Sequence, residues 1–280
     1  MTTPFLADLH IHSSFSDGKH SIPELVDFYG GRDFGAIAIT DHLCERRSVL
    51  GRAAAYLNRT LTEATFPIYQ EILKSEAKRA WEKYRMVVIP GVEFTKNSLS
   101  NHRSAHVLGL GLTQWLDPEG DPATLARGIR AFGGVAIAAH PVSTRKLEKQ
   151  TYHLWDHREE LRAEFDAWEV ASGAKLFDEI LRSDLPKIAS SDLHHKGQMT
   201  SWKTEFDCER NAEAIFQAIR GQELRFRFYQ EKSPQGSISA CDLVGAQRLH
   251  ALAPRAAARS MRDFIFSDQL SQTSPRTSRL

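Results

Sequence analysis

The sequence has few cysteines and no long hydrophobic run. Its 280 residues include only Cys44, Cys208 and Cys241, which lie far apart and form no CxxC pair. Three dispersed cysteines exclude a disulfide-rich secreted scaffold. No run of about 18 apolar residues occurs, and the N-terminal MTTPFLADLH lacks a basic segment followed by a long apolar stretch. We therefore expect reduced thiols, a cytoplasmic location and no membrane partner.

The chain also lacks an excess of charge of either sign. Its 36 Lys and Arg residues are balanced by 35 Asp and Glu residues, which gives a formal net charge of +1. The protein as a whole is therefore not attracted to nucleic acid or to an anionic membrane, and any binding of a polyanion must be local. With 41% hydrophobic and 25% charged residues, the composition is that of a globular protein with a substantial core.

Short apolar or β-branched runs alternate along the chain with helical patterns. They predict seven strands, at residues 5–12, 36–40, 86–94, 105–112, 135–140, 166–172 and 187–193. Helices are expected at 22–29, where Ser21 and Glu24 form a capping-box pattern, and at 122–132. This α/β alternation predicts a mainly parallel sheet covered by helices, and seven such units suggest a closed barrel.

Two regions exceed a minimal barrel. We expect residues 43–85 to form a helical insertion, which is either a cap over the active site or a plain packing helix. After residue 223, LRFRFYQE predicts an extra strand. The expected division is a barrel domain at 1–232, a C-terminal helical extension at 233–268 and a disordered tail at 269–280.

The first predicted strand carries two histidines one residue apart, in DLHIH. Side chains alternate between the faces of a strand, so His10 and His12 point the same way, together with Asp8. Two neutral imidazoles on one face suit a shared metal ion. Asp8 either orients one of these histidines or is an ordinary polar residue at a strand end.

Similar side chains recur near the ends of the other predicted strands, in ITDH, PGVEF, AHVLGLGL, AAHP and SSDLHH. They are His42, Glu93, His106, His140, Asp192 and His194. In a parallel barrel the carboxyl ends of all strands meet at one face. We therefore expect these residues, which are distant in the sequence, to form one site.

These motifs, in this order, resemble those of the PHP (polymerase and histidinol phosphatase) superfamily of metal-dependent phosphoesterases. The resemblance implies a distorted seven-stranded β/α barrel, similar to a TIM barrel, with two to three divalent ions at its mouth. Carried over by position, it implies one metal held by His10, His12, Glu93 and Asp192, a second held by Glu93, His106 and His140, and a third held by Asp17, His42 and His194. Such imidazole and carboxylate ligands suit Zn, Mn or Fe.

The implied reaction is hydrolysis of a phosphate ester, most simply a small phosphomonoester such as a nucleotide, by a metal-activated water. Glu93 would act as the bridging carboxylate, and Asp192 or His194 could help the leaving oxygen depart. Candidate phosphate contacts are Arg103, Arg145 and Lys196.

Other functions stay open at this point. An exonuclease or oligonucleotide phosphodiesterase would make short oligonucleotides the substrate, and a non-catalytic metal-binding module would have no substrate at all. The SWKTEF segment, which follows the last histidine motif, is expected either to bring Trp202 or Lys203 into the substrate pocket or simply to pack.

Overall fold

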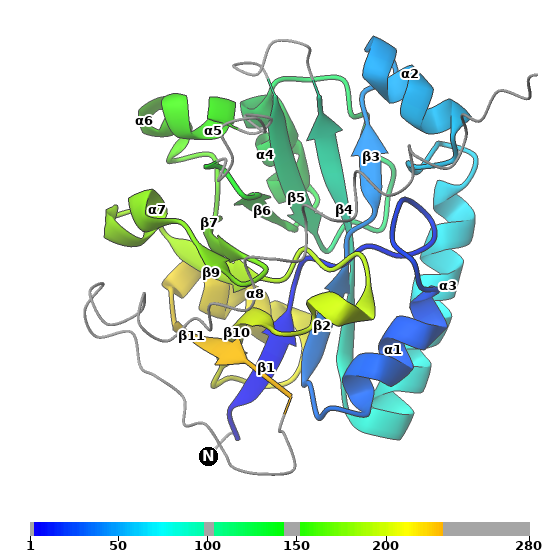
Figure 1. Cartoon of the computed structure of the whole chain (residues 1–280), viewed down its shortest axis with the longest axis vertical. Coiled ribbons are helices and arrows are strands. Elements are labelled where there is room, and N and C mark those ends of the chain that lie inside the picture. The colour runs from blue at the N-terminus through cyan, green and yellow to red at the C-terminus, as the bar shows by residue number, and fades with distance from the viewer. Residues whose placement is uncertain (1–2, 98–103, 143–151, 232–280) are drawn as a thin grey trace, which may run out of the picture. The chain divides into compact units, whose positions relative to one another are not determined.

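The computed structural model describes residues 3–97, 104–142 and 152–231 (Figure 1). The strands are β1 (Phe5–Asp8), β2 (Ala36–Ile39), β3 (His42–Cys44), β4 (Val87–Lys96), β5 (Ala105–Leu110), β6 (Val135–Ala138), β7 (Ala167–Ser172), β8 (Lys175–Leu176), β9 (Lys187–Ser190), β10 (Ser201–Phe206) and β11 (Leu224–Tyr229). The α-helices are α1 (Ile22–Gly30), α2 (Val49–Tyr56), α3 (Phe66–Tyr84), α4 (Pro122–Ala131), α5 (Tyr152–Asp156), α6 (Arg158–Leu161), α7 (Asp178–Arg182) and α8 (Ala212–Gly221).

The chain divides into two units, Met1–Leu243 and Val244–Leu280. The second unit, the predicted extension at 233–268 and the predicted tail at 269–280 all lie outside the described residues. No helix in the described part of the chain is long and apolar enough to span a bilayer.

The strands form one eleven-stranded mixed sheet that curls into a half-barrel. Nine of them follow the order β11-β10-β1-β2-β4-β5-β6-β7-β8, while β3 pairs with β4 and β9 pairs with β7. All seven predicted strands are present, as is the extra strand β11, whereas β3, β8 and β10 were not predicted. The strand count therefore exceeds that of the expected seven-stranded barrel.

The expectation of a mainly parallel sheet is wrong. Strand β5 runs antiparallel to both β4 and β6, and β10 runs antiparallel to both β1 and β11. Lys96 at the end of β4 consequently pairs with Ala105 at the start of β5. The beginning of β5, and not its end, lies beside the carboxyl end of β4.

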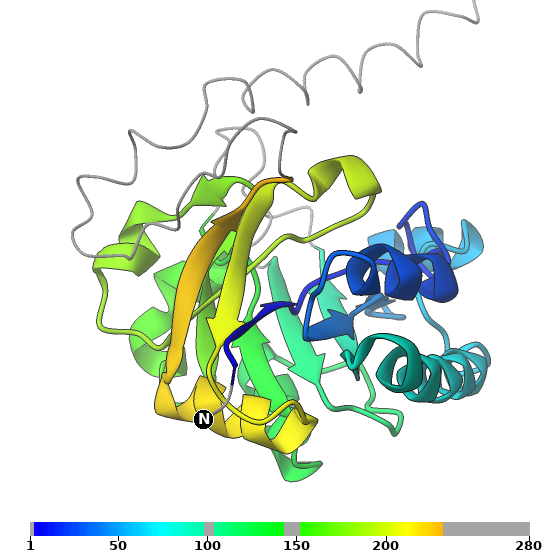
Figure 2. The same cartoon turned by 90° about the horizontal axis from the view of Figure 1, so that it is seen from below.

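Helices flank the sheet, as the capping signals and apolar faces predict. Ser21 accepts a hydrogen bond from the Glu24 amide, and the Glu24 side chain accepts one from the Ser21 amide, so the expected capping box starts α1. Figure 2 shows α1 and α3 together on one flank of the sheet. Tyr69 of α3 is buried there, with its hydroxyl 2.8 Å from the Ile39 carbonyl and 2.9 Å from that of Gly91. The long helix of the 43–85 segment thus packs against the sheet.

An apolar cluster packs between the strands of the sheet and α8. The strands contribute residues such as Leu108 and Ile137, and α8 contributes Ile215 and Ile219, all of them buried. Burial of one such side chain stabilises the fold by about 1.5–3 kcal/mol. The core therefore holds the strand ends, on which the polar residues lie, in fixed relative positions.

A threonine side chain connects β10 to β9 across the curl of the sheet. The buried Thr204 hydroxyl accepts a hydrogen bond of 3.1 Å from the Ala189 amide and donates one of 2.8 Å to the Ala189 carbonyl. The Thr204 side chain therefore links β10 to β9 in place of the backbone hydrogen bonds that join other neighbouring strands.

Thr204→Val should lower the free energy of unfolding by about 1–3 kcal/mol, because the buried Ala189 amide loses this hydrogen-bond partner. Chemical denaturation measures the change. Thr204→Ser, which keeps the hydroxyl, is the matched control and should cost clearly less. Equal losses in the two variants would show that the hydroxyl does not stabilise the β9–β10 connection.

Candidate metal centre

All nine predicted ligands meet at one edge of the sheet. They form four overlapping groups, and in each group the potential ligand atoms lie within 4.8 Å of one another. The groups are His10–His12–Glu93, Glu93–His106–His140, His10–His140–Asp192 and His12–Asp17–His42–His194. His106 joins them from the start of β5, because that strand runs antiparallel to its neighbours.

Glu93 lies at the centre of this cluster. Its side chain is fully buried on β4, and its oxygens lie 2.8 Å from His42 Nδ1, 2.9 Å from His106 Nδ1, 3.1 Å from His140 Nε2, and 3.5 Å from the Nε2 atoms of His10 and His12. Burial alone would raise the pKa of Glu93, but the surrounding histidines hold it well below its usual range. Glu93 is therefore a carboxylate shared between separate groups of histidines.

His10 and His12 direct two ring nitrogens at the same point. Their Nε2 atoms are 3.0 Å apart, and Asp192 Oδ1 lies 3.3 Å from the first and 3.2 Å from the second. Both imidazoles are fully buried. Burial, followed by the charges of His194 and His42, lowers the pKa of His12 to about 3, so His12 is a neutral nitrogen donor.

The group around Asp17 is the most open to solvent. Asp17 Oδ1 lies 3.2 Å from His194 Nε2 and 3.4 Å from His42 Nε2, and the side chains of Asp17 and His194 are 29% and 27% exposed. His12 Nδ1 lies 3.9 Å from the same carboxylate oxygen. His12 therefore belongs to this group as well as to the group of His10, which the sequence did not indicate.

The donor set fits divalent cations. Three buried atoms, His12 Nδ1, Asp17 Oδ1 and Glu93 Oε2, have no described partner in hydrogen-bonding geometry, although His194 Nε2 lies 3.2 Å from Asp17 Oδ1 and His42 Nδ1 lies 2.8 Å from Glu93 Oε2. A buried polar atom without a partner costs about 1–3 kcal/mol, and a bound cation would remove that cost. Nitrogen and carboxylate oxygen donors together suit Zn, Mn or Fe.

Two of the nine residues have a backbone conformation that is unusual for their type. His140 has φ of 26° and Asp192 has φ of 52°, in the left-handed region that favours glycine. Such residues cost about 1–3 kcal/mol each and persist only where the surrounding structure holds them. The strand β9 ends at Ser190, so this local bend, and not the alternation of a strand, brings Asp192 toward His194. Asp192 Oδ1 lies 3.5 Å from His194 Nδ1.

Sequence reasoning missed two acidic residues that hold the ligands in place. The buried Glu169 on β7 lies 2.9 Å from His10 Nδ1 and accepts a 2.7 Å hydrogen bond from the His140 amide. The buried Asp41 accepts hydrogen bonds from Ser13 and from the Ser16 hydroxyl, and so fixes the loop that leads to Asp17. Two features of the sequence could have indicated these residues. Glu169 is an acid within the apolar run AWEVAS, and Asp41 directly precedes His42 in ITDH.

The contacts of Asp8 and Lys203 decide between the alternatives that the sequence left open. Among the described residues, Asp8 has hydrogen-bond partners in Tyr29, Ser191 and Lys203, and none of them is a histidine. Lys203 is fully buried, which favours the packing alternative over a place in the substrate pocket. Trp202 packs edge-to-face against Phe228.

Of the three candidate phosphate contacts, Arg103 and Arg145 lie outside the described residues. The Lys196 ammonium lies 5.4 Å from the centre of the Phe28 ring on α1. Its role toward a substrate stays a prediction.

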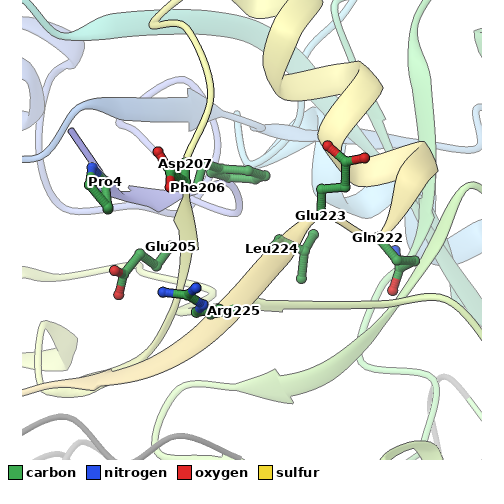
Figure 3. Close-up of a pocket in the computed structure, with 8 residues that line it drawn as sticks. All are labelled: Pro4, Glu205, Phe206, Asp207, Gln222, Glu223, Leu224 and Arg225. Carbon is green, nitrogen blue, oxygen red and sulfur yellow. The ribbon is translucent and has the colours of Figure 1, made fainter. Parts of the chain in front are cut away.

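A separate cavity lies at the opposite end of β1. It has a volume of about 320 Å³ and is lined by residues around the end of β10 and the start of β11, among them Glu205, Glu223 and Arg225 (Figure 3). Phe206, in its wall, pairs with Phe5 at the start of β1, whereas His10 follows the end of that strand. None of the nine candidate ligands lines it.

The PHP domain family model matches residues 8–182, which is more than half of the chain. The chain therefore belongs to the PHP domain family. The matched range includes seven of the nine candidate ligands, while Asp192 and His194 follow it. No curated protein matches the sequence.

One solved structure shows the same fold. A two-domain protein from Bacteroides vulgatus that contains a predicted PHP-like metal-dependent phosphoesterase is similar with a TM-score of 0.59 and 19% identity, over 81% of this chain and 66% of the other. This chain thus spans slightly less than two thirds of that relative. A candidate metal-dependent phosphoesterase from Bifidobacterium adolescentis (TM-score 0.44, 15% identity, 68% of this chain and 88% of the other) and an amidohydrolase from Chromobacterium violaceum with bound sulfate and no metal (0.45, 17%, 69% and 88%) are less similar.

Glu169→Gln should weaken metal binding about 10–100-fold, because the amide cannot support His10 as a carboxylate does. Isothermal titration of the metal-free protein with Zn²⁺ or Mn²⁺ measures this change. Glu205→Gln is the matched control, since Glu205 is a nearly buried acid at the far end of the sheet, paired with Arg227. The same affinity in the wild type and the Glu169 variant would refute this support.

Metal binding should release protons at neutral pH. Burial opposes protonation of His10, His42 and His194, but the neighbouring carboxylates raise the pKa of each, to about 9 for His194. These imidazoles therefore carry protons in the metal-free protein, and an incoming cation must displace them. Apparent affinity should rise with pH up to about 9. Titration in weakly buffered solution counts the released protons, and binding without release would contradict the assigned ligands.

Proposed function

We propose that this protein is a metal-dependent phosphoesterase that hydrolyses a small phosphomonoester, such as a nucleotide. The observation that carries the proposal is the sharing of the buried Glu93 carboxylate between the His10–His12 and the His106–His140 groups. A carboxylate with imidazoles on both sides suits a pair of divalent ions. Membership of the PHP domain family supports the same reaction class.

The proposed ligand sets use all nine residues of the cluster. His10, His12, Glu93 and Asp192 would hold one ion, Glu93, His106 and His140 a second, and Asp17, His42 and His194 a third. When bound, such ions lower the pKa of water to supply a hydroxide, and they stabilise the charge that develops on phosphate oxygens.

The exposure of the cluster indicates where a substrate would enter. His10, His12 and Glu93 are fully buried, whereas the side chains of Asp192 and His194 are 25% and 27% exposed. Asp192 and His194 are therefore placed to meet the phosphate ester. Although burial opposes both shifts, nearby charges hold the pKa of Asp192 well below its usual range, whereas Asp192 and Asp17 raise the pKa of His194 to about 9. We therefore assign the delivery of a proton to the leaving oxygen to His194, in protein that holds no third ion. No serine or cysteine nucleophile is needed.

The charge balance of the chain favours a small substrate. The near-zero net charge gives little general attraction to a polyanion, which makes short oligonucleotides the second candidate substrate and a long nucleic acid a poor one. The proposal includes a cytoplasmic location, in line with the free thiols of Cys44 and Cys208. It also includes a distorted seven-stranded barrel built from β1, β2, β4, β5, β6, β7 and β9.

Release of inorganic phosphate tests the proposal. Full-length protein loaded with Mn²⁺ or Zn²⁺ is incubated with nucleotides, sugar phosphates, histidinol phosphate and short oligonucleotides. Turnover of a monoester class, abolished by a chelator, is the expected result. Glu93→Gln should lower turnover at least about 100-fold while the fold is retained, because the shared carboxylate is lost.

The exposed Glu71→Gln variant on α3 is the control and should leave turnover unchanged. Cleavage of oligonucleotides without hydrolysis of monoesters would establish the diesterase. Bound metal without any turnover would favour the non-catalytic module.

A further inference from the structure

A buried ion pair joins β1 to β10 in the interior of the sheet. Lys203 Nζ lies 2.5 Å from Asp8 Oδ2, and both side chains are fully buried. The ammonium also donates to the Ser201 hydroxyl at 2.7 Å. Burying two charges is costly even when they are paired, and removal of one partner leaves an uncompensated charge in the interior. The proposed hydrolysis uses neither residue.

Asp8 collects hydrogen bonds from three separate parts of the chain. Besides Lys203, it accepts from the Tyr29 hydroxyl at 2.6 Å, from the Ser191 amide at 3.0 Å and from the Ser191 hydroxyl at 2.6 Å. Hydrogen bonds to an ionised carboxylate are among the strong ones. Ser191 is thus held through both its backbone and its side chain.

The residue after Ser191 is the candidate ligand Asp192. Its left-handed backbone directs its carboxylate toward His10 and His12. On the other side, the Leu193 amide donates to the His10 carbonyl at 3.2 Å, and the His12 amide donates to the Leu193 carbonyl at 2.8 Å. The 191–193 segment is therefore fixed between Asp8 and the backbone that carries the two histidines.

We propose that Lys203 is a positioning residue of the metal centre: it neutralises Asp8, so that Asp8 can hold Ser191 and thereby keep Asp192 aligned with His10 and His12. Lys203 and Asp192 both follow the 8–182 range of the family match. The contacts that position Asp192 therefore come in part from a segment of the chain that the family model does not match. The inference rests on the metal binding in the proposed function, but its test measures metal affinity and does not depend on turnover.

The test is isothermal titration of metal-free, full-length protein with Mn²⁺, with thermal unfolding measured on the same samples. Lys203→Met should weaken binding about 10–100-fold, as loss of a residue that orients a ligand does. The absorption spectrum of the Co²⁺-loaded protein should also change, since it reports ligand geometry. Arg79→Met is the matched control: it breaks the ion pair to the nearly buried Glu76 on α3, and should lower stability without changing metal affinity.

A double-mutant cycle shows whether Lys203 acts through Asp8. In an Asp8→Asn background, Lys203→Met should add little further loss of affinity, because no carboxylate remains to be neutralised. If Lys203→Met does not fold, Ser191→Ala tests the same chain of contacts at the Asp8–Ser191 link, because it removes the hydroxyl that donates to Asp8 at 2.6 Å and otherwise contacts only the His10 carbonyl, at 3.5 Å. That milder variant should also weaken binding measurably.

Three results would overturn the inference. Wild-type affinity and an unchanged Co²⁺ spectrum in Lys203→Met or Ser191→Ala, with only a lower unfolding temperature, would give Lys203 a purely structural role. Fully additive losses in the cycle would show that Lys203 does not act through Asp8. A wild-type protein that binds no Mn²⁺ or Co²⁺ would remove the proposed function itself, and the inference with it.

Discussion

The structure depends on compensation of charge around one buried carboxylate. Glu93 has no exposed surface, yet five imidazoles lie within 3.5 Å of its oxygens. An isolated ion would be too costly at this depth, and crowded imidazoles without it would repel one another once protonated. The buried carboxylate and the imidazoles around it therefore stabilise one another. Imidazole nitrogens and carboxylate oxygens together are ligands that suit divalent cations. The curled sheet brings these residues together from five separate segments of the chain.

Around the candidate ligands lies a set of residues that would touch no metal. Glu169 supports His10 and the backbone of His140, Asp41 holds the loop before Asp17, and the Asp8–Lys203 pair fixes the approach to Asp192. These contacts explain how His140 and Asp192 keep unusual backbone angles. Folding therefore orients the ligand side chains before any ion binds, so that less free energy is needed to order them on binding.

The sequence predicted the site better than the architecture. The histidine and carboxylate motifs identified eight of the nine clustered residues, because ligand chemistry restricts which residues can serve, and the resemblance supplied Asp17 and the grouping. Strand direction was not predictable: nothing in AHVLGLGL shows that β5 runs antiparallel, and His106 reaches the site only because it does. Strand β10 was missed because Ser201, Lys203 and Glu205 make SWKTEF unusually polar for an interior strand, whereas all six of its residues are buried. Glu169 and Asp41 were missed because a supporting acid has no spacing rule of its own.

Anomalous diffraction from crystals of the full chain loaded with Mn²⁺ or Zn²⁺ would test the central claim most directly. The account predicts at least two metal peaks within coordination distance of the nine side chains, with a Glu93 oxygen between two of them. A third peak is expected beside Asp17, His42 and His194. Peaks confined to other places on the protein, or a single ion that leaves Glu93 uncoordinated, would contradict the claim that the buried carboxylate organises a multinuclear metal centre.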